Sequence, residues 1–252
     1  MSHSDVKLSL KAQLETDLLL GGKWLPMPTV AANRENTQQV ISSPLSEETP
    51  SEVLTDKKQR LTLVAQQVAQ CTRCSLHQTR TKAVPGEGNP DARIVFVGEA
   101  PGQSEDEQGR PFVGRAGRLL TKIIEAIGLK RDEVFIGNIL KSRPPGNRDP
   151  QPAEIVACIG YLQEQLEIIE PEVIVALGAH AARTLLDSPA SIGQLRGKVH
   201  AYQPSPLMDS VKLVATYHPA YLLRNYTTES RMRVWEDMQL VLKELGMPLP
   251  SP

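Results

Sequence analysis

The sequence contains only three cysteines in 252 residues, and no apolar run approaches the roughly 20 residues that a membrane-spanning helix needs. The opening residues MSHSDVKLSL also lack the basic region and apolar run of a secretory signal. A disulfide framework is therefore not expected. These absences favour a cytoplasmic protein with no membrane partner, and we expect a monomer.

Charge and composition divide the chain near residue 56. Residues 1–56 carry 4 Lys and Arg against 8 Asp and Glu, whereas residues 57–252 carry 24 against 21. The first part is polar and has no sustained period, which is typical of a loosely ordered extension. Within it, Trp24 is at the centre of the apolar stretch LLLGGKWLPMP, which either docks a partner protein or folds back onto the core. A nucleic-acid partner would need locally clustered bases, because the net charge is only −1.

Residues 57–252 predict a single α/β domain in which strands and helices alternate. Buried strands are expected at 92–99, 133–141, 172–178 and 211–219, and helices at 61–71, 116–129, 153–170, 179–187 and 229–246. Such alternation predicts a mostly parallel four-stranded sheet with helices on both faces. In these sheets the site forms in the loops beyond the strand C-termini.

The loop after the first strand, GEAPGQSEDEQGRPF, is glycine-rich like a phosphate cradle, but it is acidic. It lacks the Lys-Ser/Thr of a P-loop, and its carboxylates would repel a phosphate, so a nucleotide-dependent enzyme is disfavoured. The other strand-end loops supply asparagine, arginine and histidine. That mixture suits an uncharged polar ligand better than a hard cation.

A planar heterocycle fits these loops. Phe112 can stack on its face, Asn138 can read its edge, and His218 can donate to a ring oxygen, with Glu99 at the end of the first strand. Clustered bases surround this set: Lys141, Arg143, Arg148 and Arg224. The combination predicts a pocket for one flipped-out base with phosphate contacts around it. Taken singly, Phe112 fits a core residue, and Asn138 and His218 fit turn residues.

Four motifs occur in order: VGEAPGQSEDEQGRPFVGRAG, NILKSRPPGNRDP, ALGAHAA and TYHPAYLLRN. Together they resemble the family 4 uracil-DNA glycosylases over about residues 64–245. The resemblance implies a three-layer α/β/α fold, and it implies excision of uracil from single- and double-stranded DNA to initiate base excision repair. The alternative is a catalytically weak uracil-binding, DNA-binding or polymerase-associated module on the same fold.

The resemblance also implies roles for individual residues. Glu99, Glu105 and His218 match catalytic positions, and Gly98, Phe112, Asn138 and His218 match the uracil-binding set. Leu222 and Leu223 lie where the superfamily inserts a wedge into the DNA stack, although a place in the core is a rival interpretation. Asp106 and Glu107, beside Glu105, are expected on a solvated face.

The cysteines form one close pair, Cys71 and Cys74 in CTRC, with Cys158 far away. A C-x-x-C pair alone fits a redox, zinc or iron–sulfur site. The resemblance implies a [4Fe-4S] cluster whose third ligand position is occupied here by Ser142. Ser142 could ligate as an alkoxide, the cluster could rest on three thiolates, or the site could be empty. We expect a weakened, structural cluster.

Overall fold

The computed structural model describes residues 56–206 and 208–250. Trp24 and the rest of the expected N-terminal extension before residue 56 lie outside this range. The first described residue, Asp56, is the N-cap of α2 (Lys57–Gln70), because its side chain accepts a hydrogen bond from the Lys58 amide at 3.0 Å.

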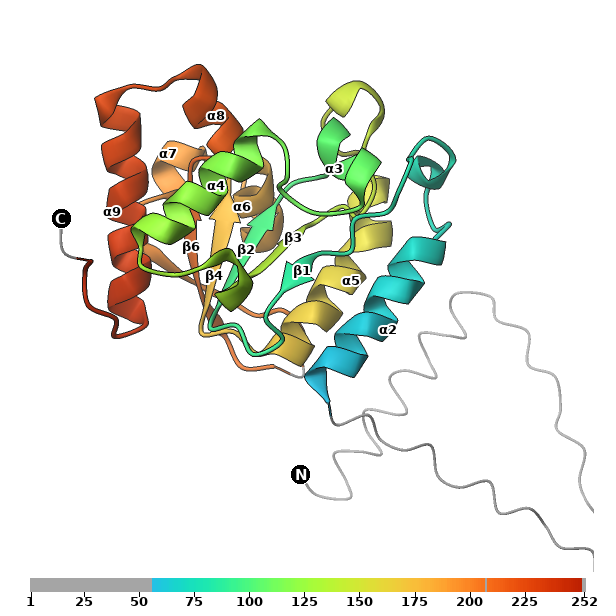
Figure 1. Cartoon of the computed structure of the whole chain (residues 1–252), viewed down its shortest axis with the longest axis horizontal. Coiled ribbons are helices and arrows are strands. Elements are labelled where there is room, and N and C mark those ends of the chain that lie inside the picture. Colours follow the sequence, from blue (N-terminus) through green and yellow to red (C-terminus); the bar gives the residue numbers. More distant parts are fainter. Residues whose placement is uncertain (1–55, 207, 251–252) are drawn as a thin grey trace, which may run out of the picture. The chain divides into compact units, whose positions relative to one another are not determined.

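A six-stranded sheet forms the centre of the domain (Figure 1), in the order β1-β3-β2-β4-β6-β5. The four central strands are parallel, and each edge strand is antiparallel to its neighbour. In chain order the strands are β1 (Glu87–Gly88), β2 (Ile94–Gly98), β3 (Phe135–Asn138), β4 (Val173–Leu177), β5 (Val199–Tyr202) and β6 (Val211–Thr216).

Helices cover both faces of the sheet, which explains why the central strands are apolar at almost every position. Alternate strand residues point to opposite layers, so Val95 and Val97 join one core and Ile94 and Phe96 join the other. The first layer contains α2, α5 (Pro152–Ile169), α6 (Ala179–Leu186) and α7 (Ile192–Leu195). The second contains α4 (Arg115–Ala126), α8 (Pro219–Arg224) and α9 (Thr228–Glu244).

The expected α/β/α architecture is confirmed, but the sheet has two strands more than the four expected. β1 is only two residues long, and β5 is mostly exposed, so neither gives an apolar pattern in the sequence. Short elements in the connections were also not expected: α3 (Gln103–Gln108) and the 3₁₀ turns η1 (Ser75–Gln78), η2 (Arg131–Glu133) and η3 (Pro145–Asn147). No described helix is long and apolar enough to span a membrane.

The parallel register aligns the strand ends that carry the expected site residues. Gly98 at the end of β2 pairs with Asn138 at the end of β3, and Leu177 at the end of β4 pairs with Thr216 at the end of β6. The four following loops therefore meet at one edge of the sheet.

Candidate active site

A cavity of about 760 Å³ opens at this edge, and we call it the strand-end cavity. Its volume lies within the roughly 300–1,000 Å³ typical of small-molecule sites. Residues from all four strand-end loops line it. They include Glu99, Glu105, Phe112, Asn138 and His218, so the structure brings the expected base-binding set together.

The floor of the cavity is closely packed around Gly98. A Cβ atom at this position would lie 2.3 Å from Asn138 Oδ1 and 2.6 Å from Phe112 Cζ, so only glycine lets the ring and the amide approach β2. Asn138 is buried, and its Oδ1 is the one buried side-chain polar atom of the described chain that has no hydrogen-bond partner. A buried acceptor without a partner is unfavourable by roughly 1–3 kcal/mol, which indicates a position prepared for a ligand donor.

The backbone of Phe112 is fixed from several sides, with φ of 50°. Oε1 of Glu105 accepts hydrogen bonds from the amides of Val113 and Gly114, both at 2.9 Å. Gly117 in the first turn of α4 passes so close that a Cβ there would lie 1.8 Å from the Phe112 carbonyl oxygen. Through these contacts Glu105 and Gly117 fix the backbone next to the Phe112 ring, while Glu105 also lines the strand-end cavity.

A second carboxylate anchors the chain just before Phe112. Glu87 in β1 accepts from Arg110 Nε at 2.7 Å and from Arg131 Nη2 at 2.9 Å, and the same Nη2 donates to the Pro111 carbonyl. Burial raises the pKa of Glu87, but the two guanidinium groups outweigh burial and hold that pKa below its usual value. The loop that presents Phe112 is thus tied to edge strand β1 before the ring and to Glu105 of α3 after it.

His218 is the N-cap of α8 and presents one specific tautomer. Its Nδ1 accepts a hydrogen bond from the Ala220 amide at 3.0 Å, so a neutral ring carries its proton on Nε2. Burial, together with the nearby charge of Arg224, lowers the pKa of His218 to about 4. The ring centroid lies 5.7 Å from that of Phe112. His218 is therefore a neutral hydrogen-bond donor at pH 7.

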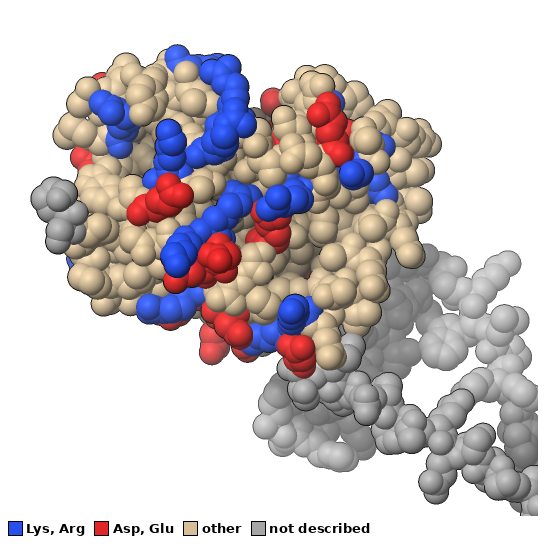
Figure 2. Space-filling view, in the orientation of Figure 1, with Lys and Arg blue, Asp and Glu red and all other residues tan. Residues whose placement is uncertain are grey.

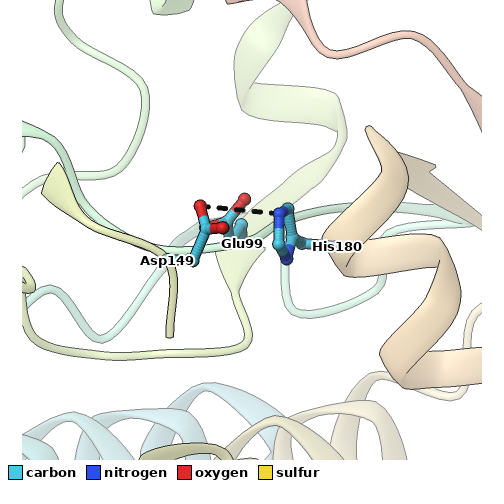
Figure 3. A group of neighbouring side chains, drawn as sticks. All are labelled: Glu99, Asp149 and His180. Carbon is cyan, nitrogen blue, oxygen red and sulfur yellow. Dashed lines mark ion pairs between the residues drawn. The ribbon is translucent and has the colours of Figure 1, made fainter. Parts of the chain in front are cut away.

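Glu99 belongs to a group of three side chains whose ligating atoms all lie within 4.8 Å of one another, the others being Asp149 and His180 (Figure 3). Asp149 Oδ1 and His180 Nε2 are 3.6 Å apart. Burial raises the pKa of Glu99, with His180 opposing that shift and Asp149 adding to it. The spacing would allow one cation, but Asp149 is exposed and the ion pair already accounts for the arrangement, so we assign no metal.

The expected phosphate-binding bases lie in different environments. Arg148 and Arg224 line the strand-end cavity, and Arg143, half-buried, donates to the Asn147 side chain at 2.7 Å. Arg148 is also paired with Glu154 through two hydrogen bonds of 2.9 and 2.6 Å. Lys and Arg side chains border the hollow at the upper edge of the surface in Figure 2.

Lys141 was expected to contact DNA, and this is wrong. Its side chain is 2% exposed, its Nζ donates to Gln165 Oε1 at 2.7 Å, and burial lowers its pKa to about 8. Its backbone amide donates to the sulfur of Cys158 at 3.2 Å. Lys141 follows Ile139 and Leu140, the two buried residues after β3, and its side chain packs inward.

Two other expectations are corrected by burial. Leu222 is 2% exposed and packs in the core with Phe112 and Val234, so it is not a wedge; Leu223 is half-buried. Asp106 is buried rather than solvated. Its carboxylate accepts a hydrogen bond from the Thr81 amide at 2.9 Å, which replaces contact with water.

A second, small cavity is lined by all three cysteines, and we call it the cysteine cavity. Cys71, Cys74, Cys158 and Ser142 all line it, although they come from three separate stretches of chain. Arg80 donates to Ser142 Oγ at 3.0 Å. Among the described residues, Glu99, Asp149 and His180 form the only group of three or more His, Cys, Asp or Glu side chains arranged to hold one metal ion, so the three thiols do not form such a group.

Several residues that line the strand-end cavity were not singled out from the sequence, and they include Asp149, His180, Tyr217 and Tyr221. All four stand in the motifs that follow strand ends. Nothing in the sequence, however, indicated which side of its loop or helix each side chain would occupy.

Comparison with known proteins agrees with this geometry. The family model described as the uracil DNA glycosylase superfamily matches residues 85–239. A type-4 uracil-DNA glycosylase of Thermotoga maritima is 48% identical over 184 residues, which cover 73% of this chain and 93% of the relative. The type-4 enzyme of Archaeoglobus fulgidus is 44% identical over 192 residues, covering 75% and 94%. That of Sulfurisphaera tokodaii is 48% identical over 167 residues, covering 64% and 75%.

The state of His218 can be tested directly. Long-range ¹H–¹⁵N NMR at pH 7 is expected to show the proton on Nε2, and the ring should stay neutral from pH 8 down to about 5, because its pKa is about 4.

The pKa of His218 in the folded chain lies below the unfolded value near 6.5. His218 therefore contributes fully to the free energy of unfolding above about pH 6.5, and this contribution is lost as the pH falls from about 6.5 toward 4. Replacing Arg224 with Gln should raise the pKa of His218. A proton on Nδ1, or titration near 6.5 in the folded chain, would contradict this assignment.

Proposed function

This chain belongs to the uracil-DNA glycosylase superfamily, and we propose that it hydrolyses the N-glycosidic bond of uracil everted from DNA, which initiates base excision repair. The observation that carries the proposal is Asn138, whose buried Oδ1 lacks a partner in the described chain and lies beside the Phe112 ring. An everted uracil can satisfy that oxygen while its face stacks on Phe112.

Asn138 supplies the selectivity for uracil. Its Oδ1 accepts from the uracil N3–H, and its amide nitrogen donates to O4. Cytosine carries a bare nitrogen at the first position and an amino group at the second. Binding cytosine would therefore leave buried polar atoms unpaired on both sides, which disfavours it strongly.

His218 stabilises the leaving group. When the C1′–N1 bond breaks, uracil leaves with the bonding electron pair and its O2 gains negative charge. The Nε2 proton of His218 is donated in a hydrogen bond to O2, and its placement in a buried site makes this interaction stronger than in water. Since the pKa of His218 is about 4, the ring acts as a neutral donor and does not transfer its proton at pH 7.

Glu99 acts at the sugar, the other group that the broken bond had joined. Its carboxylate orients a water molecule whose oxygen bonds to C1′, and its negative charge offsets the cationic sugar. The water gives up one proton to the solvent as its oxygen bonds to C1′, and the departing uracil anion takes up one proton, so the products are free uracil and an abasic site. Asp149 and His180 lie beside Glu99, with their ligating atoms within 4.8 Å of its carboxylate.

For the cysteine cavity we propose an iron–sulfur cluster bound by Cys71, Cys74 and Cys158, with Ser142 at the fourth position. The donor set fits a cluster, because three thiols and the Ser142 hydroxyl belong to residues that line one cavity, and in the described chain the three thiols do not form a group arranged to hold a single ion. Within the described part of the chain, the buried ammonium of Lys141 has only the neutral Gln165 amide as its hydrogen-bonded partner, and thiolates would balance its charge. The cluster would supply structural stability, by joining the end of α2 to the loop after β3.

The proposed reaction is tested by incubating the protein with uracil-containing oligonucleotides and then with alkali, which cleaves only abasic sites. We expect cleavage of both single- and double-stranded substrates. Glu99→Gln and Asn138→Ala should each slow single-turnover cleavage by roughly 100-fold or more, because each removes a group that contacts the reacting nucleotide. Glu107→Gln removes a carboxylate from the exposed face of α3 and should match the wild type. Binding without cleavage would support the non-catalytic alternative, and unchanged rates in both variants would contradict the assigned roles.

The positioning role of Glu105 makes a different prediction. Glu105→Gln keeps an oxygen that can accept from the Val113 and Gly114 amides, and it should stay within about tenfold of the wild type. Glu105→Ala leaves those amides without the acceptor and should lose roughly 100-fold, since small displacements of a binding group reduce rates by that order. Steady-state kcat and KM measure both. If Gln is as damaging as Ala, the negative charge itself is required and the residue is catalytic.

Ser142 is expected to be the weak point of the cluster. Serine is a poor ligand for soft metal centres, and the Arg80 contact occupies its oxygen. Anaerobically prepared Ser142→Cys should contain about four irons per chain and lose them more slowly in air than the wild type. Ser188→Cys, which adds a cysteine away from the cysteine cavity, should not differ from the wild type. An iron-free, colourless wild-type protein would rule out the cluster, and equal air stability of the Ser142→Cys and wild-type proteins would rule out the weak fourth position.

A further inference from the structure

The helix that was expected to carry a DNA wedge presents a different residue at the rim of the strand-end cavity. α8 starts directly after His218, and its first turn directs Leu222 into the core at 2% exposure. Tyr221, the preceding residue, is 39% exposed and lines the cavity. Successive helix residues lie about 100° apart, so Leu222 and Tyr221 cannot both face the rim.

Tyr221 stacks on a second tyrosine that is itself held in place. The ring centroids of Tyr217 and Tyr221 are 5.0 Å apart, at an interplanar angle of 27°. The Tyr217 hydroxyl accepts from Arg233 Nη1 at 3.1 Å, and the Arg196 guanidinium carbon lies 5.7 Å from the Tyr217 ring centroid. Tyr217 thus packs against one side of the Tyr221 ring, and part of Tyr221 stays exposed to solvent.

We propose that Tyr221, supported by Tyr217, is a stacking platform for the base next to the everted uracil on the same strand. The inference rests on the proposed function. Eversion of uracil removes one stacking partner from its neighbour, and an aromatic ring at the rim of the receiving cavity can replace that partner. Arg224, one turn further along α8, also lines the cavity and offers positive charge for the adjoining phosphate.

The chemistry of the rim favours nucleic acid as the occupant. Stacking on tyrosine is largely independent of base identity, which suits an enzyme that must find uracil in any sequence context. Because the neighbouring base lies on the same strand as the uracil, the platform operates on single- and double-stranded DNA alike.

The experiment measures binding of DNA in which the uracil nucleotide carries a 2′-fluorine, which suppresses cleavage by destabilising the cationic sugar. The base on the 5′ side, or the base on the 3′ side, is replaced in turn by an abasic tetrahydrofuran. Fluorescence anisotropy gives Kd for each DNA with wild type and Tyr221→Ala. We expect that removing the base on one side weakens wild-type binding by roughly 5- to 150-fold, and Tyr221→Ala binding by less than about twofold.

Two further variants test whether the effect belongs to the ring at this position. Tyr221→Phe keeps the aromatic face and should behave like the wild type. Tyr226→Ala removes another exposed tyrosine, which is 60% exposed and faces Arg231 outside the cavity, and it should also behave like the wild type.

The outcomes separate this inference from the proposed function. If the flanking base contributes equally to wild type and Tyr221→Ala, the platform is wrong, while tighter binding of fluorinated uracil than of thymine DNA still supports the proposed function. If the wild type does not distinguish these two DNAs, the proposed function is wrong, and the platform with it.

Discussion

The packing of Gly98 against Phe112 and Asn138 is the constraint on which the strand-end cavity depends. A single methyl group at residue 98 would overlap both side chains, so the backbone of β2 sets where the stacking ring and the reading amide lie. Glu105 and Gly117 then hold Phe112 in a left-handed backbone conformation. The cavity is thereby shaped before a base arrives, which reduces the ordering that binding must supply.

In the proposed reaction, a neutral donor faces the leaving base and a carboxylate faces the sugar, and the cavity provides a different environment for each. His218 is kept neutral by burial and by Arg224, and its backbone contact leaves the Nε2 proton available to the leaving base. Glu99 lies with Asp149 and His180 at the same cavity, and in the proposed reaction its carboxylate would supply negative charge for the sugar. Separate environments for two titratable groups are a common way to assign a donor and a carboxylate their different roles.

The two cavities are linked through one short piece of chain. β3 ends with Asn138 at the strand-end cavity, and the loop that follows carries Ser142, four residues later, at the cysteine cavity. Between them, the buried Lys141 side chain anchors the same segment to α5 through Gln165. A group that stabilises the cysteine cavity therefore also stabilises the position of Asn138, although the two sites share no chemistry.

The sequence by itself determined the α/β architecture and the set of residues at one sheet edge, because parallel strands bring their C-terminal loops together whatever the details of packing. It could not determine the edge strands β1 and β5, which are too short or too exposed to give an apolar pattern. Tertiary structure alone decided which side of each element a residue occupies. Lys141 and Leu222 turned inward and Tyr221 outward, because the direction of a side chain near a strand end or in a short helix depends on what packs against that element.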